Sequence, residues 1–211
     1  MVENARQHLA NPDFQRDAMA VIERTVTNLR ELMAQVSAVA RSPEMKPEAC
    51  GLRELVQDAL QAAGLVSGTA SGIQTTVRTH GEDRLTVDRR QVVRLLTNLL
   101  TNAREALNGG GEIELEAELS GRDPQGATEL TLTVRDNGRG MDEEFIRTAL
   151  FKPFASTKSS GLGIGLTQCR SIVEAHGGTI SVESRAGVGT RFVVRLPVPP
   201  SAPGPALEPA P

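Results

Sequence analysis

The chain has 211 residues, and its 23 lysines and arginines against 26 aspartates and glutamates give a formal net charge of −3. This balance gives no electrostatic case for nucleic acid as a partner, and the sequence shows no membrane span, signal peptide or lipidation motif. Two distant cysteines, Cys50 and Cys169, form neither a disulfide framework nor a metal-binding spacing, so we expect reduced thiols in a cytoplasmic protein of one or two domains.

A long helix is predicted near the N-terminus. Asn11 and Pro12 read as a helix cap followed by proline at the first helical position, and the pattern ends at Ser42-Pro43. Apolar residues recur between them in steps of three and four: Met19, Ile22, Val26, Leu29, Met33, Val36 and Ala40. This narrow seam favours a coiled coil or helix bundle; the alternative is one amphipathic helix packed on its own domain.

The rest of the chain predicts a layered α/β sandwich, with a mixed sheet covered on one face by helices. The expected strands are Ile73–Thr79, Arg84–Val87, Glu112–Leu119, Glu129–Asp136, Thr179–Ser184 and Thr190–Leu196. The expected helices are Leu52–Ala63, Arg89–Asn108, Asp142–Leu150 and Ile164–His176. Residues 120–127 are expected to form a hairpin connection.

The helix Arg89–Asn108 carries two asparagines, Asn98 and Asn102, among leucines at helical spacing. Because they are four residues apart, they lie on the same side of the helix, one turn above the other. Amide oxygens are hard, neutral ligands that suit an Mg²⁺ ion sharing phosphate oxygens. The alternative is a pair of solvated surface asparagines, which is less favoured because asparagine is a mediocre helix former.

The strand Glu129–Asp136 ends in the segment DNGRGM. A carboxylate at this strand end can accept a hydrogen bond from the exocyclic amine of adenine. Guanine presents a carbonyl oxygen at the same edge, and an unsatisfied buried polar group costs about 1–3 kcal/mol. Gly138 and Gly140 let the backbone turn sharply and lie close to a flat base. Taken alone, the segment is more typical of a hairpin or an Asx-turn.

The segment GLGIGL, Gly161 to Leu166, opens the helix Ile164–His176. Free N–H groups and the positive end of the helix dipole then point at whatever anion lies there, and phosphate suits them. A Rossmann turn looks similar. However, the polar segment FKPFASTKSS, which contains Lys158, precedes this loop in place of a strand.

Together these segments resemble the catalytic, ATP-binding part of sensor histidine kinases, in the wider GHKL group that includes gyrase, Hsp90 and MutL. The sequence matches the family's asparagine, first glycine, phenylalanine and second glycine boxes in TNLLTNAREAL, DNGRGM, FKPFASTK and GLGIGL. The ending GGTISVESRAGVGTRFVVRLP resembles the family's closing hairpin. The resemblance covers roughly Cys50 to Pro197 and implies a Bergerat-type fold that binds ATP and Mg²⁺.

The resemblance also implies roles for single residues. Asn102 would hold Mg²⁺, Asp136 would bind adenine with Thr190 near the base, and Lys158 would face the phosphates. The segment from Met141 to Ser160 would be the mobile ATP lid. The implied nucleotide-binding residues are Asn98, Asn102, Asp136, Gly138, Gly140, Met141, Phe154, Ser156, Thr157, Lys158, Gly161, Leu162, Gly163, Ile164, Gly165, Leu166 and Thr190. The implied catalytic residues are Asn102, Lys158 and Glu105.

One position separates the chemistries within this group. Members that hydrolyse ATP resemble one another in placing a glutamate one turn before the metal-binding asparagine, where it activates water. Asn98 occupies that position here, and an amide has no basicity for the task. Glu105 can reach the same face, and we interpret it as a water-mediated metal or lid contact, or as a solvated helix residue. A kinase that holds ATP for an incoming nucleophile is therefore implied.

The N-terminal helix looks like the second helix of the family's dimerisation hairpin. It is most similar to that helix in kinases of the PEP-CTERM-associated branch. We therefore expect three parts: residues 1–45, a dimerisation helix; residues 46–197, the catalytic domain; and residues 198–211, a disordered tail rich in proline and alanine. The implied partners are a second copy of the chain, bound through this helix, and the receiver domain of a response regulator. Membrane attachment would come only through regions absent from this chain.

The family's phosphoacceptor histidine normally lies on the first helix of the hairpin and is followed at once by an acidic residue. His8 is followed by Leu9, and too few residues precede Asn11 for that helix. His80 is expected in a polar turn and His176 at a helix end, so all three histidines read as structural or solvated. We therefore expect a truncated kinase that cannot phosphorylate itself.

Two other functions remain open. The first is a GHKL-type ATPase, which Asn98 disfavours. The second is a regulatory ATP-binding module or a serine kinase of the anti-sigma type. A His-Asp or His-Glu pair upstream of this chain would exclude that second function.

Overall fold

A computed structural model describes residues 15, 17–22, 45–120, 128–155 and 163–199. The chain divides into two units, Met1–Arg41 and Ser42–Pro211. In the first unit residues 17–22 are helical, and the side chains of Met19 and Ile22 are exposed. The remainder of the predicted N-terminal helix, the predicted connection after Ser120 and most of the predicted tail lie outside the described residues. No described helix is long and apolar enough to cross a membrane.

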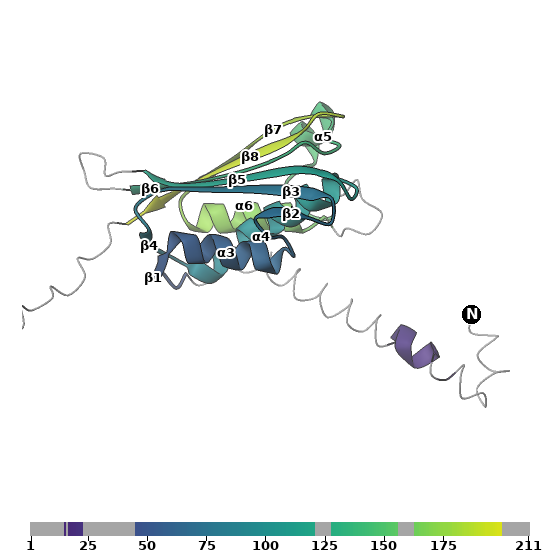
Figure 1. The fold of residues 1–211 in the computed structure, drawn as a ribbon, viewed down its shortest axis with the longest axis horizontal. Coiled ribbons are helices and arrows are strands. Elements are labelled where there is room, and N and C mark those ends of the chain that lie inside the picture. The colour runs from purple at the N-terminus through teal and green to yellow at the C-terminus, as the bar shows by residue number, and fades with distance from the viewer. Residues whose placement is uncertain (1–14, 16, 23–44, 121–127, 156–162, 200–211) are drawn as a thin grey trace, which may run out of the picture. The chain divides into compact units, whose positions relative to one another are not determined.

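The second unit is a two-layer α/β structure (Figure 1). Its helices are α3 (Leu52–Ala62), α4 (Arg89–Ala106), α5 (Glu143–Thr148) and α6 (Gly165–Ala175). Its strands are β1 (Glu48–Gly51), β2 (Gly68–Ala70), β3 (Ile73–Gly81), β4 (Arg84–Val87), β5 (Gly111–Ser120), β6 (Thr128–Asp136), β7 (Thr179–Arg185) and β8 (Gly189–Val198). The predicted α/β sandwich is confirmed.

Six strands form one mixed sheet in the order β2-β3-β5-β6-β8-β7. Strands β3 and β5 are parallel and the other neighbours are antiparallel. Helices α3, α4 and α6 lie on one face of this sheet, and the short helix α5 lies near the ends of β7 and β8 (Figure 1). Since β3 is followed by β4, which pairs only with β1 in a separate two-stranded sheet, the chain leaves the main sheet before α4 and re-enters it at β5.

The predicted helices and strands between residues 52 and 196 are all present, with ends that differ by no more than two residues. The prediction missed the short strands β1 and β2, whose three or four residues carry no clear period. It was also wrong about His80, which lies within β3 and not in a turn. The ring of His80 is 3.6 Å from a carboxylate oxygen of Glu116 on the neighbouring strand β5.

The core forms where the sheet meets the helices. Along β6, Leu130, Leu132 and Val134 are buried, while the residues between them are partly or fully exposed. This alternation packs one side of the strand against the leucine-rich side of α4, where Leu95 and Leu99 are fully buried. The period-two strand and the 3.6-period helix thus bury complementary faces against each other.

Helix α4 has a well-defined start. The carboxylate of Asp88 accepts hydrogen bonds from the backbone N–H groups of Gln91 at 3.1 Å and Lys46 at 3.0 Å. Burial alone would raise the pKa of Asp88, but these donors hold that pKa below its ordinary value. A charged N-cap stabilises the helix by about 1 kcal/mol. The cap fixes the start of α4 at Arg89, and Asn98 and Asn102 follow on this helix.

Candidate nucleotide-binding site

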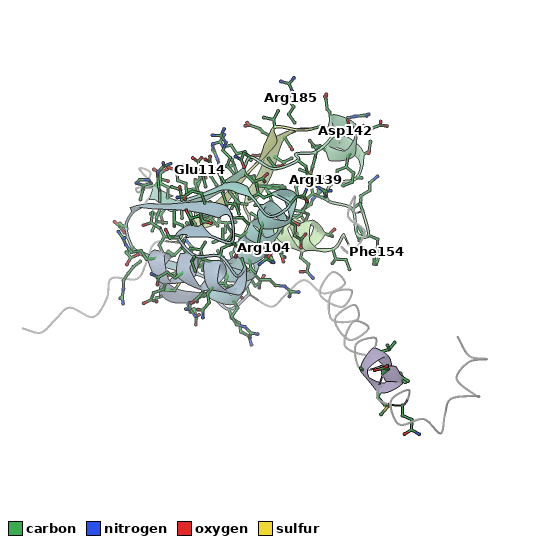
Figure 2. All side chains as sticks on the ribbon, turned by 45° about the vertical axis from the view of Figure 1, so that its right-hand side comes forward. Arg104, Glu114, Arg139, Asp142, Phe154 and Arg185 are labelled. Carbon is green, nitrogen blue, oxygen red and sulfur yellow. The ribbon has the colours of Figure 1, made fainter. Side chains whose placement is uncertain are left out.

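The segment after β6 is fixed between α4 and the β7–β8 hairpin. On one side, the backbone N–H of Arg139 donates to the carbonyl of Ala106 at the end of α4, at 3.1 Å. On the other, the N–H of Gly187 donates to the carbonyl of Arg139 at 2.7 Å. Figure 2 shows Arg139 and Arg185 at the same end of this unit. The loop therefore joins the asparagine helix to the closing hairpin.

Two glycines in this loop leave no room for a side chain. A Cβ added to Gly138 would lie 2.7 Å from the backbone of Ala106. Gly140 has a φ of 62°, and its added Cβ would lie 2.0 Å from the carbonyl oxygen of Arg185. Any larger residue at these positions would push the loop away from α4 or from the hairpin. These glycines thus allow the loop to approach α4 and the β7–β8 hairpin closely, and the predicted approach to a base stays a prediction.

Asp136 ends β6 with a side chain that is 6% exposed. One carboxylate oxygen, Oδ1, accepts a hydrogen bond from the N–H of Gly138 at 2.9 Å. A bond from a carboxylate to an N–H two residues ahead is an Asx-turn, so this alternative from the sequence is correct as a description of the backbone. It is compatible with a role in base recognition, because the turn holds the carboxylate in one orientation.

Thr190 lies directly opposite Asp136 on the neighbouring strand β8 and is equally buried. Its hydroxyl is 2.9 Å from the hydroxyl of Ser184 on β7. Ser184 Oγ also accepts from the N–H of Met141 at 2.9 Å and lies 2.9 Å from the carbonyl of Gly189. The structure therefore brings Asp136 and Thr190 together as predicted, and adds Ser184, which sequence reasoning missed.

We expect Ser184→Ala to loosen this loop. The substitution removes the acceptor of the Met141 N–H and the partner of the Thr190 hydroxyl, and it should lower the free energy of unfolding by about 1–3 kcal/mol. Urea denaturation measures this change. Ser181→Ala on the same strand is the control, because Ser181 is exposed. Equal stability of the two variants would show that the Ser184 contacts do not hold the loop.

The predicted phosphate side of the site is described in part. Gly163 has a φ of 66°, and its added Cβ would lie 2.5 Å from the carbonyl oxygen of Ala155. Ile164 is buried and precedes α6, whose first turn holds the half-buried Gly165 and Leu166. Phe154 is 64% exposed. The remaining predicted residues of this side lie outside the described residues: Ser156, Thr157, Lys158, Gly161 and Leu162.

The two asparagines of α4 lie one turn apart, as predicted, and both are half-buried. The amide nitrogen of Asn98 faces α6, 3.3 Å from the carbonyl oxygen of Gly165. Glu105 is exposed in the last turn of α4. Within the described part of the chain no three His, Cys, Asp or Glu side chains gather as a metal site. Mg²⁺ that keeps several waters and binds phosphate oxygens needs only one or two protein oxygens, so the amide of Asn102 fits such an ion.

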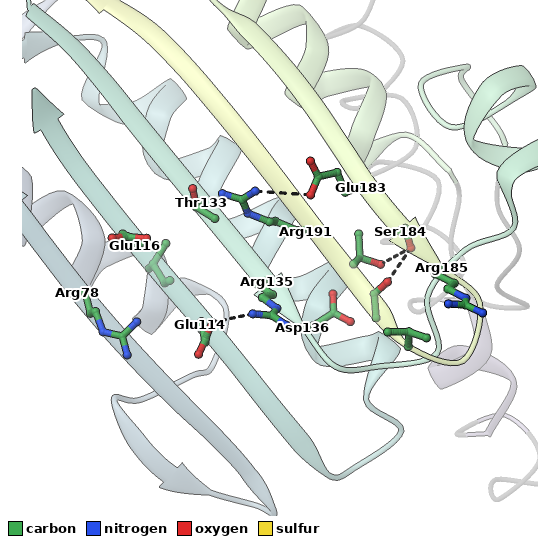
Figure 3. Close-up of a pocket in the computed structure, with 14 residues that line it drawn as sticks. Arg78, Glu114, Glu116, Thr133, Arg135, Asp136, Glu183, Ser184, Arg185 and Arg191 are labelled. Carbon is green, nitrogen blue, oxygen red and sulfur yellow. Dashed lines mark hydrogen bonds and ion pairs between the residues drawn. The ribbon is translucent and has the colours of Figure 1, made fainter.

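A shallow groove of about 650 Å³ lies across the strands beside this site (Figure 3). Its outer-face side chains include two exposed ion pairs, Arg135 with Glu114 at 3.8 Å and Arg191 with Glu183 at 3.5 Å. Because successive side chains of a strand alternate between faces, Arg135 points away from the side on which Asp136 is buried. The charged side chains of the groove therefore lie on the open face of the sheet, while Asp136, Ser184 and Thr190 also line the groove and join it to the candidate base site.

Comparison with known proteins agrees with this geometry. Residues 87–200 match the model of the family described as "Histidine kinase-, DNA gyrase B-, and HSP90-like ATPase". The C4-dicarboxylate transport sensor protein DctS of Rhodobacter capsulatus is 35% identical over 186 residues, which cover 87% of this chain and 26% of that protein. The chain spans well under half the length of the curated relatives it matches.

Two solved structures share the fold. Full-length ShkA in complex with AMPPNP has a TM-score of 0.72 and 22% identity, covering 90% of this chain and 40% of that one. Histidine kinase ThkA in complex with the response regulator TrrA has a TM-score of 0.66 and 24% identity, covering 94% of this chain and 56% of that one.

Proposed function

Because the chain belongs to the family of histidine kinase-, DNA gyrase B- and HSP90-like ATPases, we propose that it is the ATP-binding catalytic part of a two-component sensor histidine kinase. The observation that carries this proposal is the buried carboxylate of Asp136, oriented by Gly138 in a loop fixed on both sides. Such a carboxylate accepts from the adenine amine and opposes the guanine carbonyl. The site therefore selects ATP, with Thr190 beside the base.

The phosphates of ATP would be bound at the start of α6. The backbone N–H groups of its first turn, next to the glycine loop 161–165, face them with the positive end of the helix dipole. By resemblance to the family, Lys158 would add a positive charge, and the segment from Met141 to Ser160 would be the lid over the nucleotide. Asn102 would hold Mg²⁺, which would neutralise phosphate charge. In phosphoryl transfer the protein mainly positions groups and neutralises charge, so this set of residues is sufficient.

The nucleophile is a histidine outside this chain, and the phosphoryl group passes from it to a response regulator. Support comes from position 98, where an amide replaces the glutamate that activates water in the family's ATPases. ThkA, a structural neighbour, was crystallised with its response regulator. Dimerisation through the N-terminal helix is supported by the apolar seam of its sequence, to which Met19 and Ile22 of the described helical segment belong. We place the protein in the cytoplasm and in the PEP-CTERM-associated branch of the kinases.

Asn102→Ala is expected to weaken Mg²⁺-dependent binding of ATP by about tenfold, the effect of losing one oxygen ligand. Binding of metal-free ADP should change little, since Asn102 acts through the ion. Titration calorimetry with ATP and Mg²⁺, and with ADP in a chelator, measures both. Asn102→Asp is the matched control, because it keeps an oxygen ligand at the same place. Should ATP and ADP weaken equally in Asn102→Ala, Asn102 is a packing residue and not a metal ligand.

A further inference from the structure

Three polar side chains form one row across the sheet at the candidate base site. Asp136 on β6, Thr190 on β8 and Ser184 on β7 lie opposite one another in the register of these strands. Because directly paired residues of neighbouring strands point to the same face, all three side chains lie on the face where Asp136 is buried. Arg135 and Glu183 belong to the adjacent row, which points to the open face (Figure 3). The row thus brings one carboxylate and two hydroxyls together.

The hydroxyl of Ser184 has its full set of hydrogen-bond partners. It lies 2.9 Å from each of three groups: the backbone N–H of Met141, the carbonyl oxygen of Gly189 and the hydroxyl of Thr190. A hydroxyl supplies one O–H donor and accepts through two lone pairs. The N–H of Met141 can only donate, and the carbonyl of Gly189 can only accept. The single proton of Ser184 therefore goes to Gly189, and Ser184 is an acceptor toward Thr190.

Thr190 is consequently the donor in its contact with Ser184. Only this direction satisfies all three partners of Ser184 at once. The residue is 6% exposed, and its one hydroxyl proton is used inside the protein. What remains on Thr190 Oγ1 is the capacity to accept. An ionised carboxylate also only accepts, so Asp136 and Thr190 both present acceptors to a base at this end of the sheet.

The backbone around Ser184 holds this proton arrangement in place. Gly189 has a φ of 135°, and an added Cβ would lie 2.1 Å from the carbonyl oxygen of Asp136. The start of β8 therefore lies tightly against the end of β6, and the carbonyl that accepts from Ser184 belongs to this fixed backbone. The donor on the other side, the N–H of Met141, belongs to the loop that α4 and the β7–β8 hairpin hold.

We propose that Ser184 is a positioning residue for base specificity, which makes Thr190 an acceptor and so suits the site to a purine with an amino group at position 6. The inference rests on the proposed ATP site, because the direction of the Thr190 proton matters for binding only where a base lies beside it. An amino group donates to the two acceptors. A carbonyl oxygen at the same position of the purine is itself an acceptor and receives no proton from Thr190.

Ser184→Ala tests this role with ATP and inosine triphosphate (ITP), which has a carbonyl at position 6 and no amino group at position 2. In the variant the Thr190 hydroxyl can rotate and donate to that carbonyl. The ratio of the Kd for ITP to the Kd for ATP, measured by titration calorimetry with Mg²⁺, should fall by about tenfold. Loosening of the loop affects both nucleotides and cancels in the ratio. Ser184→Thr keeps a hydroxyl at this place and should keep the wild-type ratio.

Thr190→Val shows whether the change passes through Thr190, since valine has a similar shape and no hydroxyl. Ser184→Ala should leave the ratio of the two Kd values unchanged when it is added to Thr190→Val. An unchanged ratio in Ser184→Ala alone, with ATP still bound, would refute the positioning role and leave the proposed function standing. The same is true of a fall in the ratio that is equally large in the Thr190→Val background. A wild type that binds neither nucleotide would reject the proposed function, and this inference with it.

Discussion

Asp136→Asn is expected to remove most of the preference for adenine nucleotides. The amide oxygen can still accept from Gly138, as the carboxylate does at 2.9 Å. The other end of the side chain becomes an NH₂ donor, which opposes the adenine amine and suits the guanine carbonyl. Because a hydrogen bond to a charged group contributes about 1.5–3 kcal/mol, ATP affinity should fall by about 10- to 100-fold. GTP affinity should stay equal or rise.

Titration calorimetry with ATP, ADP and GTP, each with Mg²⁺, measures this switch. Asp83→Asn is the matched control: Asp83 is exposed in the turn between β3 and β4, and an asparagine oxygen can still accept from the backbone N–H of Arg53. The unfolding free energy of Asp136→Asn should stay close to that of the wild type, since the bond to Gly138 is kept. Unaltered ATP affinity in Asp136→Asn, or equal affinity of the wild type for GTP, would remove Asp136 from base recognition.

The part of the site that depends on local sequence could be predicted. Strand β6 alternates with period two and α4 repeats with period 3.6, so both elements and the strand-end position of Asp136 follow from the order of the residues. Gly138 and Gly140 were predicted to let the backbone turn sharply and approach a flat base; both lie close to other parts of the chain, and the approach to a base stays a prediction. These features require only that a strand end, a turn and a helix follow one another in the chain.

Contacts between distant segments could not be predicted in this way. Ser184 reaches Thr190 and Met141 because β7 and β8 pair in one particular register, and one residue of slip would turn Ser184 to the other face. Asn98 was expected beside Asn102 from helical spacing, which is correct. Which acceptor its amide meets depends on how α6 packs across α4, and helical spacing within one element carries no information about that packing.

At His80 the local sequence predicted the wrong structure. The polar run THGED is typical of a turn, yet β3 continues through His80 to Gly81 because β5 supplies a parallel partner along its whole length. Pairing across the sheet overrides local preference here. His80 therefore lies on the open side of the sheet beside Glu116, away from the helix-covered side where Asp136 is buried.

We expect this chain, incubated with Mg²⁺ and ATP labelled on the γ-phosphate, to bind the nucleotide without labelling itself. The ring nitrogen Nδ1 of His176 lies 2.8 Å from the carbonyl of Ile172, and its other nitrogen is buried. His80 lies on the open face of the sheet. His8, outside the described residues, lacks the acidic neighbour of the family's acceptor. Acid-labile, base-stable label that disappears in His8→Ala would overturn this expectation.

Hydrolysis of ATP should also be slow, because position 98 carries no general base for water. General-base catalysis contributes about 10²–10⁴-fold to a rate, and the amide of Asn98, held against Gly165, cannot supply it. Steady-state phosphate release and label transfer to a separate helical fragment carrying a His-Asp or His-Glu pair measure the two fates of the γ-phosphoryl group. Transfer to the fragment together with slow release is expected of a kinase. Rapid release that is lost in Glu105→Ala would instead make Glu105 the base that activates water, because a carboxylate one turn beyond Asn102 would then do what Asn98 cannot.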